Sequence, residues 1–133
     1  MFLVTRRATV LVPSGTAEQP DLKHLFILLN DPVKDEKLVL MVSISTVRPG
    51  RFHDGCCLLG IGDHPFIKCA SFVLYSKARI ESVKTLEEGV RQQLLVPKDP
   101  MDGAVFARIC EGVLTSRHTP IEIKRFFEPI WRP

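Results

Sequence analysis

Two long apolar runs joined by a short polar link constrain the fold of this chain more than any other feature. The first run is LKHLFILLN (residues 22–30), and the second is LVLMVSIST (residues 38–46). The link between them contains the turn formers Asn30, Asp31 and Pro32, followed by residues of mixed charge. The second run is apolar until its polar end, which is typical of a strand covered on both faces. The sequence therefore predicts a β-hairpin within a sheet that is buried on both sides.

Further strands are expected on either side of this hairpin, and helices after it. Strand-like runs occur at 8–13 (ATVLVP), 56–61 (CCLLGI) and 66–80 (FIKCASFVLYSKARI), the last as one strand or two. Helical spacing of apolar residues follows at 82–95, 102–118 and 119–129. Asp102 is the expected N-cap of the second helix. For the third helix we expect Thr119 as N-cap, Pro120 as the first helical residue and Glu122 as the partner in a capping box.

The length of 133 residues is that of one domain. We expect a single domain over residues 1–133, with a β-barrel at 1–80 and a helical part at 82–133. The fold class predicted from these patterns is mainly β with C-terminal helices, and the strands are short enough for a small barrel.

Charge and cysteine content narrow the function classes. The net charge of +3 permits nucleic-acid binding but is far below that of a histone-like protein. Four cysteines include the adjacent pair Cys56 and Cys57, which would point to opposite faces of a strand, unlike a secreted disulfide framework. The N-terminal residues do not resemble a signal peptide, and no run approaches 18 apolar residues. We therefore expect a cytoplasmic protein that does not bind a membrane.

Polar residues that can perform chemistry gather where the predicted strands end. A base, an acid and several cations or hydroxyls are what metal-free cleavage of a phosphodiester requires, and the pKa of free histidine, about 6.5, suits both proton transfers. Strand ends from distant parts of the chain converge at the mouth of a small barrel. The residues at the predicted strand ends are Lys23, His24, Asp31, Ser43, Ser45, Thr46, His53, Asp63, His64, Lys68 and Ser71.

Each of these residues also has a purely structural interpretation. His64 precedes Pro65 and would then only end a strand, while His24 would be a satisfied core or edge histidine. Lys68 would point to solvent by strand alternation. A zinc site built from His53, His64 and nearby cysteines is disfavoured because the spacing matches no regular zinc motif.

The two hairpin runs, HLFILLNDP…KLVLMVSIST, followed by GDHPFIKCASFVLY, resemble the MazF/PemK-like toxin superfamily of type II toxin–antitoxin systems. The similarity is greatest to a divergent branch with a G-[DE]-H-P-F-I-[KR] motif. The resemblance implies an SH3-like barrel of the MazF/CcdB type with appended helices. It also implies a homodimer that cleaves single-stranded RNA without metal or cofactor and that a cognate antitoxin protein inhibits.

The chain departs from this family at one position of chemical importance. Typical members carry a catalytic Arg-Pro pair in the strand that corresponds to residues 23–30, where this chain has Lys23 and His24. Either His24 replaces the arginine, or catalysis has moved to His64 and Lys68, or the activity is lost.

Our leading interpretation makes His64 and His24 the acid–base pair of an endoribonuclease, with Lys68 neutralising phosphate charge. The remaining predicted substrate-binding residues are the hydroxyl-bearing Ser45, Thr46 and Ser71 and the cationic Lys23 and Arg48. Two alternatives stay open. The same barrel mouth would serve a non-catalytic module that binds nucleic acid or protein. A structural protein would instead use Phe126, Phe127 and Trp131 either at an oligomer interface or to close the barrel.

Overall fold

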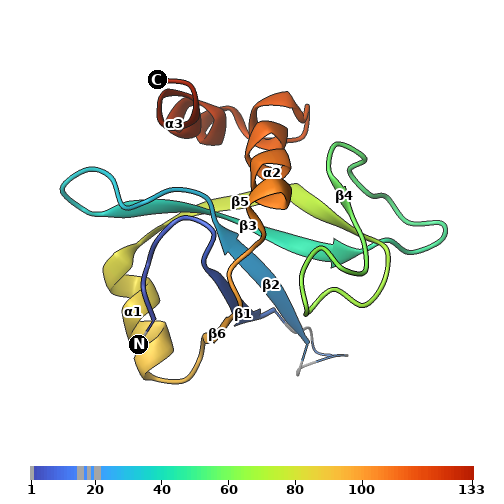
Figure 1. Cartoon of the computed structure of the whole chain (residues 1–133), viewed down its shortest axis with the longest axis horizontal. Coiled ribbons are helices and arrows are strands. Elements are labelled where there is room, and N and C mark those ends of the chain that lie inside the picture. The colour runs from blue at the N-terminus through green and yellow to red at the C-terminus, as the bar shows by residue number, and fades with distance from the viewer. Residues whose placement is uncertain (1, 15–16, 18, 20–21) are drawn as a thin grey trace.

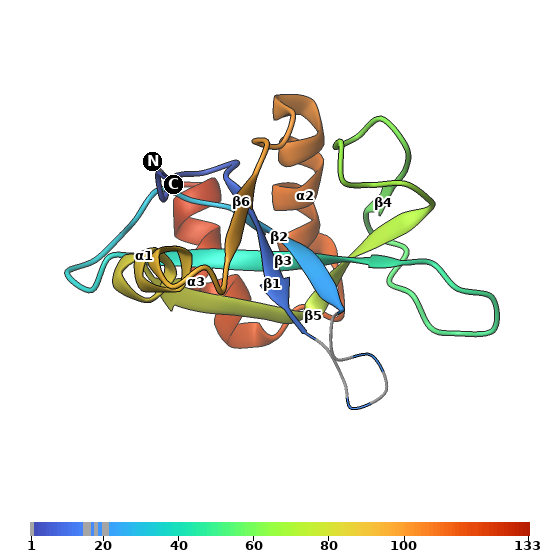
Figure 2. The ribbon, with the colours of Figure 1, turned by 90° about the horizontal axis from the view of Figure 1, so that it is seen from below.

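The computed structural model describes residues 2–14, 17, 19 and 22–133 of the chain. The strands are β1 (Thr9–Pro13), β2 (Lys23–Leu28), β3 (Leu38–Thr46), β4 (Leu58–Leu59), β5 (Ser71–Ser82) and β6 (Val96–Lys98), and the helices are α1 (Val83–Arg91), α2 (Gly103–Thr115) and α3 (Ile121–Trp131). The strands form one antiparallel sheet in the order β4-β5-β3-β2-β1-β6, which curls into a half-barrel (Figure 2). The mainly-β prediction with C-terminal helices is confirmed for these residues.

The predicted hairpin is formed by β2 and β3, which pair antiparallel with Phe26 opposite Ser43. On its other edge β3 pairs with β5 along almost its whole length, and an irregularity between Met41 and Ser43 shifts the register. Such a shift bends a strand and increases its twist, which agrees with the curl of the sheet.

Both faces of the sheet are covered, as the continuous apolar runs predicted. Figure 1 shows α2 and α3 on one side of the sheet and α1 on the other. Leu25 and Ile27 belong to the core under α2 and α3, whereas Phe26 and Leu28 belong to a second core that contains Leu86 of α1. Successive side chains of a strand point to opposite faces, so a strand between two cores needs apolar residues at every position.

The strand predictions need correction in three places. The run at 56–61 forms only the two-residue strand β4. β5 is one strand that begins at Ser71, so residues 66–70 are a loop, and Lys68 is not placed by strand alternation. β6 was not predicted at all. It comprises only three residues with Pro97 at its centre. Proline has no backbone N–H to donate to a neighbouring strand, so a run that contains proline is not normally predicted as a strand. Because β6 pairs with β1, the sheet includes a strand from residues 82–133, which were expected to be helical.

The helix predictions are confirmed in number and position but not in every boundary. Asp102 caps α2, with its Oδ2 accepting from the backbone N–H groups of Ala104 and Val105. The capping box predicted for α3 is wrong. Pro120 has an extended ψ of 145° and is itself the N-cap, so the helix begins one residue later, and the buried Thr119 hydroxyl has no partner in the described part of the chain.

The C-terminal tail packs onto the core instead of standing free. Phe127 is fully buried, and the Trp131 ring stacks on it with centroids 6.1 Å apart. The indole Nε1–H of Trp131 donates to Glu111 Oε2 of α2 at 2.9 Å. Of the two roles left open for this tail, the packing favours closure of the core.

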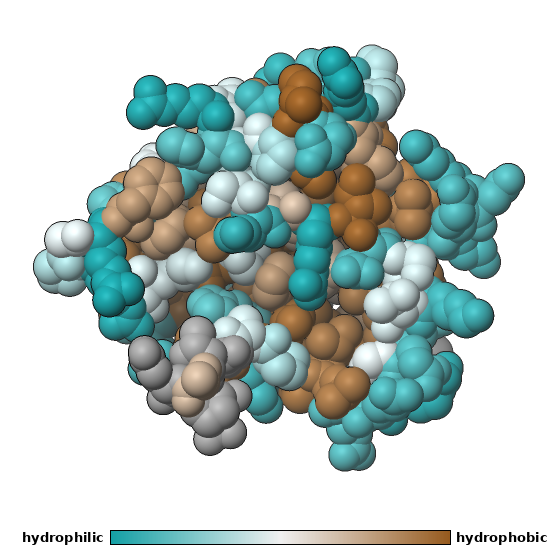
Figure 3. All heavy atoms as spheres, turned by 180° about the vertical axis from the view of Figure 1, so that it is seen from behind, coloured by the Kyte–Doolittle hydropathy of each residue, from teal (hydrophilic) through white to brown (hydrophobic). Residues whose placement is uncertain are grey.

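Hydrophilic and hydrophobic side chains are interspersed on the face opposite to that of Figure 1, with hydrophilic ones around its rim (Figure 3). Within residues 2–14, 17, 19 and 22–133, no helix has the length and apolar character needed to cross a membrane.

Candidate functional site

A groove lies where β2 begins and where β3 ends, beside the start of β5. Its volume of ≈ 390 Å³ falls within the range of small-molecule sites, about 300–1,000 Å³. The described residues that line it are Gln19, Leu22, Lys23, His24, Leu25, Ile44, Ser45, Thr46, Arg48, Arg51, Phe66, Ile67, Lys68, Cys69 and Ser71. All predicted catalytic and substrate-binding residues except His64 belong to this lining, although they come from segments that are far apart in the sequence. Of the other strand-end candidates, Asp31, Ser43, His53 and Asp63 are not among the lining residues.

The groove has a cationic lining. Four positively charged side chains contribute to it, Lys23, Arg48, Arg51 and Lys68, and none of its described lining residues is acidic. All four residues are exposed, and none of them forms an ion pair with a described carboxylate. Cations that are not paired with a described carboxylate raise the local concentration of anionic ligands, so the groove is suited to bind a polyanion.

His24 is the one histidine among the described residues of the groove and is half-buried. Partial burial lowers the pKa of His24 below its usual value of 6.5, because desolvation penalises the charged form, and the imidazole is therefore neutral at pH 7. Its Nδ1 is hydrogen-bonded to Ser14 Oγ. When Nδ1–H is the donor to Ser14, the lone pair of Nε2 is available to take a proton, and Nε2 has no partner in the described part of the chain.

The three predicted hydroxyl residues all line the groove but differ in availability. The Ser71 hydroxyl is buried and donates to the Cys69 carbonyl at 2.9 Å, so the loop uses it. Among the described residues, Thr46 Oγ1 has a single hydrogen-bond partner, the Cys69 thiol, which is a weak donor at 3.8 Å. Ser45 has no side-chain hydrogen bond to a described residue. Ser45 and Thr46 are therefore the hydroxyls that a ligand can reach.

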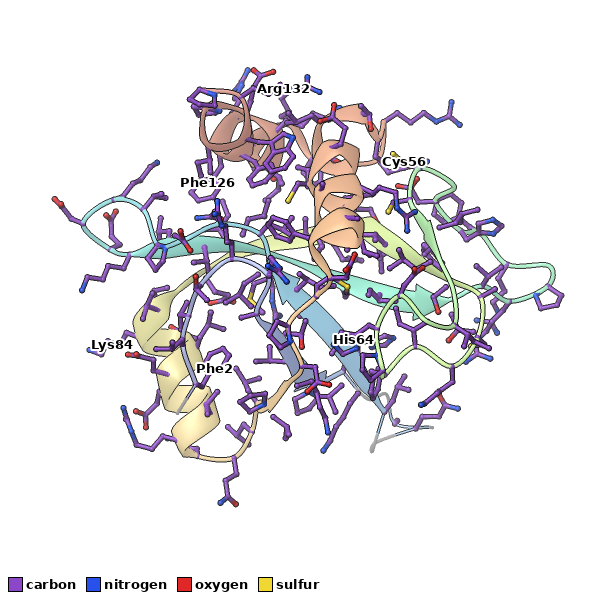
Figure 4. All side chains as sticks on the ribbon, viewed as in Figure 1. Phe2, Cys56, His64, Lys84, Phe126 and Arg132 are labelled. Carbon is purple, nitrogen blue, oxygen red and sulfur yellow. The ribbon has the colours of Figure 1, made fainter. Side chains whose placement is uncertain are left out.

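His64 is outside the groove lining and is 3% exposed. Its Nε2 lies 2.6 Å from the Asp99 carbonyl, to which it donates, and its Nδ1 accepts the backbone N–H of Phe66 at 3.0 Å. Figure 4 shows His64 between its loop and the segment that leads into α2. Both ring nitrogens are thus engaged in holding the 60–70 loop against the protein, and the structure does not bring His64 together with His24.

Sequence reasoning did not assign eight of the described lining residues to the site, and Arg51, Cys69 and Phe66 are three of them. Arg51 was visible as one of several loop arginines, but nothing in the sequence separated it from those that lie elsewhere. Cys69 sits next to Lys68 in a segment that we expected to be a strand. Phe66 is an exposed aromatic residue directly after the turn former Pro65, and that position was the available signal.

Other candidate residues lie away from the groove. Asp31 is at the opposite end of the hairpin, where it accepts from the Thr5 hydroxyl and the Arg6 backbone N–H. Asp63 Oδ2 accepts the Gly60 backbone N–H at 2.8 Å and so closes its own turn.

The described cysteines and histidines are not grouped as metal ligands. No group of three His, Cys, Asp or Glu side chains in the described part of the chain is placed to hold a metal ion. Cys56 lies beside α2, with its Sγ 3.2 Å from Thr115 Oγ1 (Figure 4). Burial raises the pKa of Cys57, and it raises the pKa of Cys110 to about 12, so neither thiol ionises at neutral pH.

Comparison of the chain with protein-family models, with curated proteins and with solved structures found no match.

Proposed function

We propose that the groove binds single-stranded RNA and that the chain is a metal-independent endoribonuclease with His24 as its general base. One observation carries this proposal. The described lining of the groove places four cations that form no ion pair with a described carboxylate, and two available hydroxyls, around a neutral, half-buried histidine. A cation cluster binds phosphates, and a neutral histidine accepts the proton of a hydroxyl. RNA supplies both partners, a phosphodiester and a neighbouring 2′-hydroxyl.

The proposed reaction is an internal transfer of the phosphoryl group. His24 Nε2 takes the proton of the 2′-hydroxyl, the 2′-oxygen forms a bond to phosphorus, and the bond from phosphorus to the 5′-oxygen breaks. A water molecule in the open groove protonates the leaving 5′-oxygen, and the resulting hydroxide takes the proton back from His24. The products are a 2′,3′-cyclic phosphate and a 5′-hydroxyl.

The remaining groove residues would stabilise charge on the reacting phosphate. Lys68, Lys23 and Arg48 supply positive charge, and Ser45 and Thr46 donate hydrogen bonds to the phosphoryl oxygens. Such donors act most strongly on the charge that develops in the transition state. The described lining contains no carboxylate, the ligand type that Mg²⁺ prefers, which is why we assign the chemistry to side chains.

The resemblance to MazF/PemK-like toxins extends the proposal to partners. On this basis the proposal also includes an SH3-like barrel of the MazF/CcdB type, a homodimer, a cognate antitoxin that blocks the groove, and a cytoplasmic location. All four cysteines are free thiols, as expected in a reducing compartment.

The position of His64 favours a second candidate, a module that binds single-stranded RNA without cleaving it. The acid–base pair predicted from the sequence is not assembled, because both ring nitrogens of His64 are bonded within the fold. In that case His24 would contribute to binding alone.

Cleavage of a long mixed-sequence RNA in EDTA distinguishes these two candidates. We expect the wild type to produce fragments with 2′,3′-cyclic phosphate ends and His24→Gln to lose about 100-fold or more in rate. His118→Gln, which changes a histidine packed on Phe52 outside the groove, is the matched control and should retain the wild-type rate. Salt-sensitive RNA binding with no cleavage by any variant would establish the binding module instead.

A further inference from the structure

Phe66 is the aromatic residue of the described groove lining, and its exposure needs an explanation. Its side chain remains 41% exposed although its neighbours in the sequence are anchored. Two residues before it, His64 is buried, and directly after it, Ile67 is buried in the core under α2 and α3. The fold thus holds the backbone of Phe66 at the groove while leaving the ring partly in water.

Hydrogen bonds of His64 hold the backbone of Phe66 in place. The Phe66 N–H donates to His64 Nδ1 at 3.0 Å, and the Ile67 N–H donates to the His64 carbonyl at 2.9 Å, which closes a tight turn. On its other side the His64 ring donates from Nε2 to the Asp99 carbonyl, which also accepts the Thr9 hydroxyl at 2.7 Å. The turn that carries Phe66 is therefore tied to β1 and to the segment before α2.

A partly exposed aromatic ring on an anchored backbone, among cations, matches the chemistry of a nucleotide. Bases of single-stranded RNA stack on aromatic side chains, and stacking tolerates any base because each presents a π-face. The backbone phosphate beside that base would meet the cations Lys68 and Arg48 of the same lining. An aromatic residue that is already positioned loses little conformational entropy when it binds.

We infer that Phe66 is a stacking platform for one unpaired nucleobase in the groove and that His64 is the residue that positions it. This inference rests on the proposed binding of single-stranded RNA and adds that the groove recognises a base as well as the phosphate backbone. It also gives a role to the histidine that the fold removes from the catalytic pair.

The test compares two oligonucleotides of equal length, one of single-stranded RNA and one abasic strand that keeps the sugar–phosphate backbone. Phe66→Leu should weaken binding of the RNA about tenfold and leave binding of the abasic strand unchanged. Phe66→Trp should retain RNA binding because it restores a stacking surface. Phe52→Leu is the matched control, since Phe52 is 64% exposed, packs on His118 and is not a groove residue.

Two His64 variants test the positioning role. In His64→Asn the side-chain oxygen can still accept the Phe66 N–H, as in an Asx-turn, whereas His64→Ala removes that acceptor. We expect the ratio of RNA affinity to abasic-strand affinity to persist in His64→Asn and to fall toward one in His64→Ala. A role confined to stability would lower the melting temperature of both variants without changing this ratio, and would overturn the positioning claim.

The outcomes also separate this inference from the proposed function. If the wild type binds both strands equally and Phe66→Leu changes neither affinity, the stacking platform is refuted while the phosphate-binding groove stands. If Phe66→Leu weakens both strands alike, the residue acts through the shape of the loop, and the stacking claim is again refuted. If the wild type binds neither strand at low salt, the proposed function and this inference both fail.

Discussion

The two ends of the β2–β3 hairpin both carry polar residues but use them differently. At the turn end, the buried Asn30 side chain makes three hydrogen bonds, from Nδ2 to the carbonyls of Asp31 and Leu38 and from the Leu40 N–H to Oδ1. Asp31 next to it accepts from Thr5 and Arg6. Every one of these polar groups is used by the fold.

At the groove end of the same strands, the side chains are largely without partners. The side chains of Lys23, Ser45 and Lys68 form no hydrogen bond or ion pair with any residue that the structure describes, and Thr46 has only a distant thiol. Hydrogen bonds and ion pairs to described residues therefore do not account for the presence of these side chains in one concave site. Polar residues at strand ends therefore occur both at a structural turn and at a candidate site. The two differ in that the polar side chains of the turn are hydrogen-bonded within the fold, whereas most of those in the groove are not bonded to described residues.

The largest expected effect is on stability and comes from the turn end. Asn30→Ala removes three hydrogen bonds and leaves the buried Leu40 N–H unpaired, so the free energy of unfolding should fall by about 2–4 kcal/mol. Ser45→Ala, at the other end of the hairpin, should change it by less than about 0.5 kcal/mol. Urea denaturation of both variants checks this. Equal losses would remove the distinction between the two ends.

The pH dependence of RNA cleavage should follow the ionisation of His24. The base must be neutral, and burial lowers the pKa of His24 below 6.5, so the rate should be constant above about pH 6.5 and fall about tenfold per pH unit on the acid side of the lowered pKa. Because the folded pKa is the lower one, protonation of the unfolded chain below pH 6.5 also reduces stability. Rates measured from about pH 4.5 to 8 with folding monitored in parallel separate the two effects, and a rate that rises as pH falls would contradict the assignment.

Removing charge at the groove end should weaken RNA binding more than removing it at the turn end. The double variant Lys23→Gln with Lys68→Gln should bind RNA about fivefold to tenfold more weakly, and the slope of log affinity against log salt should decrease by about 0.7 for each phosphate that is no longer neutralised. Lys34→Gln with Lys37→Gln makes the same change in net charge at the hairpin turn. If both pairs weaken binding alike, RNA responds to overall charge and not to the groove.

The smallest expected effect concerns acid stability at the turn. The hydrogen bond from the Thr5 hydroxyl, followed by that from the Arg6 N–H, lowers the pKa of Asp31 from its usual 3.8. The stability that this adds is present above about pH 4 and is lost as pH falls through the lowered pKa. Asp31→Asn should therefore flatten the acid limb of a thermal-melting profile slightly. An unchanged acid limb in Asp31→Asn would show that these hydrogen bonds contribute nothing measurable.

The hairpin, the helices and seven of the described groove-lining residues could be predicted from the sequence because each depends on local patterns. The apolar runs specify strands with two covered faces, and Asp102 before an amphipathic stretch specifies the start of α2. Residues at the start of β2 and the end of β3 meet whenever the two strands pair, so Lys23, His24, Ser45 and Thr46 were found together.

The features that escaped prediction depend on tertiary contacts. β6 exists because β1 offers an edge to three residues that include a proline. The burial of His64 depends on the Asp99 carbonyl, 35 residues away in the chain. Similarly, Gly112 permits a close approach that no local pattern reveals, since a Cβ there would lie 1.9 Å from the Tyr75 hydroxyl oxygen.

The most direct test of RNA binding at the groove end is an NMR titration. Backbone amide chemical shifts of the ¹⁵N-labelled protein would be followed while a short single-stranded RNA is added in EDTA. If the groove end is the RNA site, the shifts that change will concentrate at the start of β2, the end of β3 and residues 66–71, while Asn30 to Leu38 at the turn end stay constant. Changes that cluster at the turn end, or no changes at low salt, would contradict the account.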